Sequence, residues 1–138
     1  MTSGESLPDQ VKAVVADCGY TSCEEVLKYQ LKRMYHLPSF PLLQSTSLLT
    51  KVKAGFSFKE ASAIEQVKKA EVPILYIHGK EDLFVPTDMV YELYEKTNSE
   101  KELLLVPEAT HGEAYVVNKE VYESKIQEFF SKYVKTGR

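Results

Sequence analysis

The sequence predicts an α/β fold in which a parallel sheet is flanked by helices. Three short apolar runs, nearly continuous in Val, Ile, Leu and Tyr, have the pattern of strands that are covered on both faces. Helical patterns lie between and after these runs, so the order is strand, helices, strand, helix, strand, helix. This alternation is typical of a parallel sheet with right-handed crossovers.

The strands and helices can be placed in chain order. Strands are expected at residues 11–18, 72–79 and 102–107. Capping boxes, in which Ser is followed three residues later by Glu, predict helix starts at Ser22 and at Ser62. The expected helices are 21–37, Pro41 to Gly55, a short helix from Ser62 to Lys69, 87–96 and 119–135.

The connection between the first two strands is unusually long. It runs for about 53 residues, from Gly19 to Glu71, whereas a simple crossover needs about a dozen. Within a single domain, residues 1–138, we therefore expect residues 21–70 to form a helical, cap-like insertion over the carboxyl-terminal edge of the sheet. Three phenylalanines of this insertion could line an acyl pocket, although ordinary packing is the preferred alternative: Phe40, Phe56 and Phe58.

Composition excludes several classes of partner. Of the 138 residues, 43% are apolar and 27% are charged, and the net charge is −3. A mildly acidic chain without basic clusters argues against nucleic acid or an anionic membrane as partner, and no run approaches the ~18 apolar residues of a membrane span. The start lacks the pattern of a signal peptide, so we expect a cytoplasmic location unless a segment upstream of Met1 carries an export signal or an anchor.

Candidate site residues follow the second and third strands. Ligands of open parallel sheets bind beyond the carboxyl ends of the strands, where Asp82 and, 29 residues later, His111 are expected. A carboxylate there can hold an imidazole in one tautomer, so that it acts as a base toward a hydroxyl nucleophile. Asp17 is the rival acid, but a structural role is preferred for it; His78 is interpreted as a core or near-site residue and His36 as a helix-ending one.

These loops resemble those of a known family. The motif I-H-G-x-x-D-x-x-V-P, from Ile77 to Pro86, resembles the acid-bearing loop of α/β-hydrolases, above all the prolyl-oligopeptidase-like and bacterial esterase-like branches. The motif A-T-H-G around His111 resembles their histidine loop, and D-C-G-Y-T-S at residues 17–22 their turn before the cap. The resemblance covers residues 11–134. It implies the C-terminal half of a serine hydrolase that cleaves an ester, thioester or amide through an acyl-enzyme. The cap-like insertion favours a small-molecule substrate with a small or medium acyl group. The resemblance also implies Asp82 and His111 as acid and base, without a metal or an organic cofactor.

The nucleophile of that family is absent from the sequence. The family order is nucleophile, acid, histidine, and the nucleophile lies in a G-x-S-x-G turn between a strand and a helix. The segments around Ser6 and Ser57 each lack the second glycine and the preceding strand. We therefore expect the nucleophile upstream and no triad catalysis by this chain alone. The alternative is a non-catalytic α/β binding or interaction module, and an aspartate in an upstream turn would instead indicate a dehalogenase or an epoxide hydrolase.

Two further expectations concern thiols and association. Cys18 and Cys23 have neither a C-x-x-C pattern nor zinc spacing, and Cys18 is interpreted as a buried thiol rather than a nucleophile. In the family arrangement the strand between Val11 and Cys18 has neighbours on both sides, one of them in the missing half. An open edge there is a template for pairing, so we expect self-association, most simply a two-fold dimer, unless the N-terminal residues or the cap cover this edge.

Overall fold

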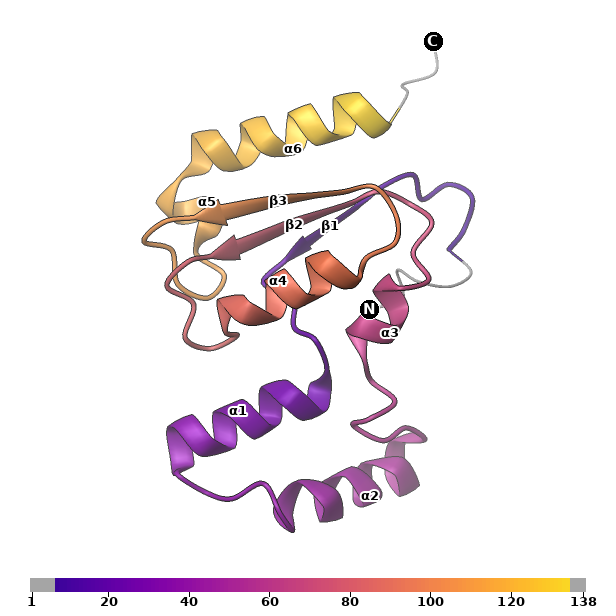
Figure 1. Ribbon diagram of the computed structural model, residues 1–138, viewed down its shortest axis with the longest axis vertical. Coiled ribbons are helices and arrows are strands. Elements are labelled where there is room, and N and C mark those ends of the chain that lie inside the picture. Colours follow the sequence, from indigo (N-terminus) through magenta and orange to yellow (C-terminus); the bar gives the residue numbers. More distant parts are fainter. Residues whose placement is uncertain (1–6, 135–138) are drawn as a thin grey trace.

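The protein contains a three-stranded parallel sheet, seen in a computed structural model that describes residues 7–134 (Figure 1). The strands β1 (Val14–Asp17), β2 (Ile74–Gly79) and β3 (Lys101–Val106) lie in the order β1-β2-β3. The central strand β2 is buried at every residue, as its continuous apolar pattern indicates. The predicted fold class, a parallel sheet with flanking helices, is therefore confirmed.

Helices cover both faces of this sheet (Figure 1). Alternate residues of β2 point to opposite faces: Ile74 and Tyr76 pack with α3 (Ala63–Val67) and α4 (Thr87–Lys96). Leu75 and Ile77 belong to the second core, to which α5 (Ala114–Val117) and α6 (Lys119–Tyr133) contribute Ala114 and Phe129. The two cores sandwich the sheet, so the carboxyl ends of the strands are held on a rigid support.

The helices α1 (Cys23–Tyr35) and α2 (Leu42–Ala54) stand away from the sheet, below α3 and α4 in Figure 1. The predicted caps are present, because the hydroxyls of Ser22 and Ser62 accept the amides three residues on. His36 ends α1 in a left-handed conformation. Of the 21–70 segment, α3 and the following Ala70 pack in the sheet's core. The role of the segment as a cap stays a prediction.

Two differences from the expected elements have local causes. The first strand is shorter than predicted, because the amide of Val11 closes a turn onto the carbonyl of Pro8 and Cys18 turns to a φ of 52°. The four-residue helix α5 was not predicted, since one turn is too short to show a period. Among the described residues, no helix has the length and apolarity needed to cross a membrane.

Candidate active site

Two loops at the carboxyl ends of β2 and β3 pack backbone against backbone. We call residues 80–86 the acid loop and residues 107–113 the histidine loop. The amide of Glu81 donates to the carbonyl of Ala109 at 3.0 Å and so joins the two loops. A Cβ placed on Gly79 would lie 2.3 Å from the same Ala109 oxygen. Glycine is therefore required at the end of β2 for the loops to approach this closely.

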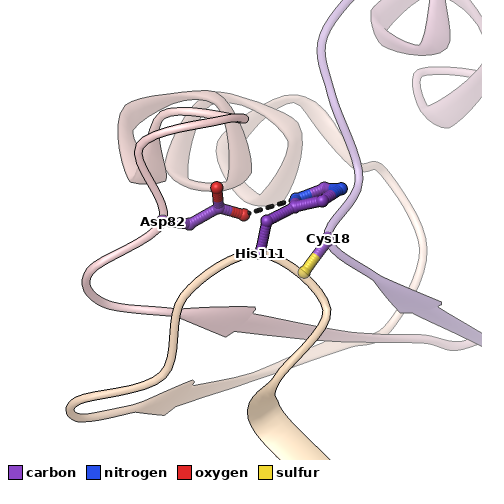
Figure 2. A group of neighbouring side chains, drawn as sticks. All are labelled: Cys18, Asp82 and His111. Carbon is purple, nitrogen blue, oxygen red and sulfur yellow. Dashed lines mark hydrogen bonds and ion pairs between the residues drawn. The ribbon is translucent and has the colours of Figure 1, made fainter.

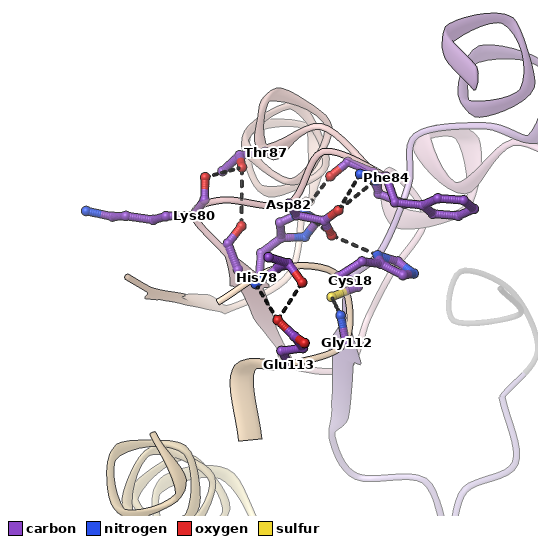
Figure 3. Close-up of polar contacts among 12 residues, drawn as sticks. Cys18, His78, Lys80, Asp82, Phe84, Thr87, Gly112 and Glu113 are labelled. Carbon is purple, nitrogen blue, oxygen red and sulfur yellow. Dashed lines mark hydrogen bonds and ion pairs between the residues drawn. The ribbon is translucent and has the colours of Figure 1, made fainter. Parts of the chain in front are cut away.

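Asp82 presents a buried carboxylate that accepts hydrogen bonds at both oxygens (Figure 3). Its Oδ1 accepts the backbone N–H groups of Phe84 and Val85, each at 2.8 Å. Side-chain to backbone bonds of this kind are a common property of aspartate in turns. Its Oδ2 lies 2.8 Å from Nδ1 of His111. The acid loop thus fixes the carboxylate with one oxygen facing the imidazole.

His111 joins the acid at the tip of the histidine loop (Figure 2). Because a carboxylate oxygen can only accept, the Nδ1 atom carries the proton, and Nε2 of a neutral ring is left with its lone pair. The ring of Phe84 packs against the imidazole with a centroid distance of 4.9 Å. The side chain of His111 is 40% exposed, which leaves it open to a further group. Glu113 holds the loop by accepting the amide of Thr110 at 3.2 Å.

His78 lies next to the carboxylate of Asp82, on the core side. It is fully buried in β2, and its Nε2 lies 2.9 Å from the carbonyl oxygen of Val85 and 3.3 Å from Oδ2 of Asp82. Since a carbonyl only accepts, Nε2 carries the proton. Its Nδ1 is buried without a hydrogen-bond partner among the described residues. His78 is therefore both a core residue and a neighbour of the candidate acid, as the sequence suggested.

Cys18 reaches the same place from the end of β1. Its Sγ accepts the backbone N–H of Gly112 at 3.2 Å. The Cys18 sulfur, a carboxylate oxygen of Asp82 and a ring nitrogen of His111 all lie within 4.8 Å of one another (Figure 2). Burial raises the pKa of the thiol to about 11; Asp17 adds to this rise, whereas the Gly112 amide opposes it. Cys18 is thus a half-buried, protonated thiol at neutral pH.

The other candidates lie elsewhere. Asp17, the rival acid, accepts the hydroxyl of Tyr122 at 3.0 Å and fixes β1 to α6. Burial, with the addition of Asp17, raises the pKa of Tyr122 to about 12. The hydroxyl of Ser57 donates to Glu60 at 2.9 Å in the turn after α2. Ser6 lies outside the described residues. Neither Asp17 nor Ser57 hydrogen-bonds to His111, whose partner is Asp82.

The phenylalanines of the insertion are not gathered in one pocket. Phe40 and Phe56 are 71% and 45% exposed. Phe58 lines a cavity of about 280 Å³ together with Leu43 and Leu48 of α2. Neither member of the acid–histidine pair lines that cavity. An acyl pocket built from these rings stays a prediction.

Sequence reasoning missed two neighbours of the pair, Cys18 and Phe84. Cys18 was assigned to the apolar run rather than to the loop that follows it, although its place at a strand's carboxyl end was a usable signal. Phe84 lies inside the acid-loop motif, in which the sequence indicated a role only for Asp82. Its contact with the imidazole depends on the packing of two loops that are distant in sequence.

Comparison with known proteins identifies the family of the chain. Residues 5–137 match the model of the prolyl oligopeptidase family. The uncharacterized protein YqkD of Bacillus subtilis (strain 168) is 33% identical over 127 residues, which make up 92% of this chain and 42% of that relative. The chain thus spans less than half of the length of the curated relative that it matches.

Solved structures share the fold. The acylaminoacyl peptidase of Pyrococcus horikoshii matches with a TM-score of 0.68 and 17% identity, over 95% of this chain and 21% of that chain. The Pyrococcus furiosus esterase Pf2001 matches with a TM-score of 0.60 and 21% identity, over 91% of this chain and 46% of that chain. The arrangement of strands and helices is therefore that of a part of an α/β-hydrolase domain. On the match over residues 5–137, the chain belongs to the prolyl oligopeptidase family.

Proposed function

We propose that this chain supplies the acid and the general base of a serine-hydrolase catalytic triad whose nucleophile comes from an upstream segment. The complete enzyme would cleave an ester, thioester or amide of a small acyl substrate through an acyl-enzyme. The observation that carries this proposal is the 2.8 Å hydrogen bond between a buried Asp82 and a partly exposed His111. The share of YqkD that the chain spans, 42%, leaves room for a nucleophile elsewhere in a longer protein.

The geometry supports a defined path for the proton. With Nδ1–H held by Asp82, the Nε2 lone pair of His111 accepts the proton of the attacking hydroxyl, while the oxygen bonds to the acyl carbon. The buried carboxylate stabilises the imidazolium that forms. That imidazolium then gives its proton to the leaving group as the acyl bond breaks. In the second half of the cycle, His111 takes a proton from water as the water oxygen bonds to the acyl carbon. It then returns that proton to the hydroxyl nucleophile as the bond of the acyl-enzyme breaks.

The open side of the pair faces the end of β1. An apolar groove of about 390 Å³ runs along this strand, lined by residues that include Val14, Ala16, Cys18 and Val67. Among the described residues, β2 is the strand with which β1 pairs, so the other edge of β1 carries no neighbouring strand. We place the nucleophile-bearing strand and its helix along this edge. A turn following that strand would then lie beside Cys18 and within reach of His111.

Cys18 is a poor substitute for that nucleophile. The thiolate is the reactive form of cysteine, and the pKa of about 11 keeps Cys18 protonated near neutral pH. Its sulfur already accepts the amide of Gly112. We therefore assign no nucleophilic role to Cys18 and expect no acyl-enzyme on this chain alone.

The first test is the reading frame upstream of Met1. A G-x-S-x-G turn that follows an apolar run supports a serine hydrolase. A stop codon favours a non-catalytic module or a split enzyme. An aspartate in that turn would replace the proposed chemistry with that of a dehalogenase or an epoxide hydrolase.

The second test compares the protein expressed from the extended frame with this chain. A fluorophosphonate should label the elbow serine of the longer protein and should leave residues 1–138 unlabelled. In the longer protein, His111→Ala should lower kcat for a p-nitrophenyl ester by about 10⁴-fold or more. The matched control is Asp17→Asn, at the rival acid, which should keep kcat within a few-fold. Labelling of the chain alone, or full activity of the His111 variant, would refute the proposal.

A further inference from the structure

We propose that Cys18, Asp82 and His111 also form a binding site for a thiophilic divalent cation of the zinc class. The three residues lie in the segments that follow β1, β2 and β3, and their side chains are neighbours (Figure 2). One ligand-type atom from each lies within 4.8 Å of the other two. Sequence spacing gives no sign of this cluster, because Cys18 is far along the chain from the histidine loop.

The donor set determines the class of cation. A thiolate, an imidazole and a carboxylate are the ligands that zinc prefers, and sulfur disfavours Mg²⁺ and Ca²⁺. Two ligands of one tetrahedral zinc stand about 3.5 Å apart, as follows from bond lengths of about 2.0–2.3 Å. The present separations of up to 4.8 Å exceed this spacing by about 1 Å, so the side chains must draw closer together to bind one ion. Three protein ligands leave the fourth position for water.

The groups that would orient these ligands are already in place (Figure 3). The amide of Gly112 donates to the sulfur of Cys18 at 3.2 Å. The amides of Phe84 and Val85 hold Oδ1 of Asp82, so that Oδ2 is the oxygen presented to the cluster. Such outer hydrogen bonds fix the orientation of metal ligands and contribute to affinity. The half-buried sulfur and the exposed imidazole leave a way in for the cation.

Charge and protons balance in the bound state. The cation displaces the proton of the Cys18 thiol into solvent, because a coordinated thiol is deprotonated. One thiolate and one carboxylate then neutralise the two positive charges, and the imidazole stays neutral. No oxidant or reductant takes part in this exchange.

Binding would remove the general base, a consequence that rests on the proposed function. If Nε2 of His111 binds the cation, its lone pair is no longer available to a hydroxyl. If Nδ1 binds, the proton of the neutral ring moves to Nε2, which then cannot accept another. The cation would thus inhibit the hydrolase by occupying its acid–histidine pair.

The test measures binding on this chain without any assay of activity. Co²⁺ is added to the reduced protein, and the near-ultraviolet sulfur-to-metal charge-transfer band is recorded. Zn²⁺ is then titrated against a chromophoric chelator. We expect one equivalent of Co²⁺ to give the band and Zn²⁺ to abolish it. Cys18→Ala should remove the band and weaken Zn²⁺ binding by more than about 10-fold, and His111→Ala should weaken it similarly.

Cys23→Ala is the matched control, because Cys23 is the other cysteine of the chain and lies outside the cluster. It should keep both the band and the Zn²⁺ affinity. Far-ultraviolet circular dichroism without metal checks each fold, and Cys18→Ser serves if the alanine variant does not fold. Absence of the band in the wild type, or its persistence after the Cys18 substitution, would overturn the proposal. Because no catalysis is measured, these outcomes are independent of the proposed hydrolase function.

Discussion

The β2–β3 end of the sheet is closed, whereas the β1 edge is open. At the closed end, backbone meets backbone at Gly79, and the acid of the candidate site is buried and fully bonded. At the open edge, β1 is half-buried at three of its four residues and exposed at Asp17, beside an apolar groove. The acid–histidine pair is therefore held within this chain, whereas the β1 edge nearest to it stays open, as the proposal of an upstream nucleophile-bearing strand requires.

The largest effect on stability is expected when a side chain is added at Gly79, in the closed end of the sheet. In Gly79→Ala the new Cβ would meet the backbone oxygen of Ala109 at 2.3 Å, so strands or loops must shift. We expect a loss of about 1–3 kcal/mol in the free energy of unfolding, measured by urea denaturation. The matched control lies at the open side: a Cβ on Gly19 meets only a side-chain carbon of Leu93, at 3.3 Å. Equal losses for the two variants would erase the contrast.

The open edge should pair with a second chain. Val14 and Cys18 donate their amides toward β2, so by the alternation along a strand the amides of Val15 and Asp17 point outward. We propose a two-fold dimer through this edge or the groove beside it. Sedimentation at micromolar concentration should show the dimer, and these two amides should gain exchange protection as concentration rises. A monomer in which both amides are protected would mean that the chain covers its own edge.

The smallest effect concerns Cys18, which lies where the two regions meet. Its pKa of about 11, against 9.0 for an ordinary thiol, predicts that alkylation by iodoacetamide rises with pH up to about 11. At neutral pH the reaction should be about 10-fold slower than in the unfolded chain, because the higher pKa makes the thiolate rarer and its greater nucleophilicity recovers only part of that loss. Cys23→Ala leaves Cys18 as the sole thiol for this measurement. A rate that levels off near pH 9 would contradict the burial argument.

The sequence allowed the fold and the acid–histidine pair to be predicted, because both depend on local patterns. Continuous apolar runs mark β2 as a covered strand, and parallel strands place the residues after them at one edge. Asp82 and His111 needed no more than this and the family resemblance. The contact between Cys18 and Gly112 could not be predicted, because it joins residues 94 positions apart and depends on a left-handed backbone at Cys18. The contact between His78 and Asp82 likewise depends on how the acid loop folds back over β2.

We expect this chain alone to hold His111 in the tautomer that a triad requires. Nitrogen-15 NMR of the imidazole in residues 1–138 measures that tautomer. We predict the neutral Nδ1–H tautomer, with a downfield-shifted Nδ1 proton that disappears in Asp82→Asn and persists in Asp17→Asn. A ring that is mainly protonated at Nε2, or a proton signal indifferent to the Asp82 substitution, would contradict the claim.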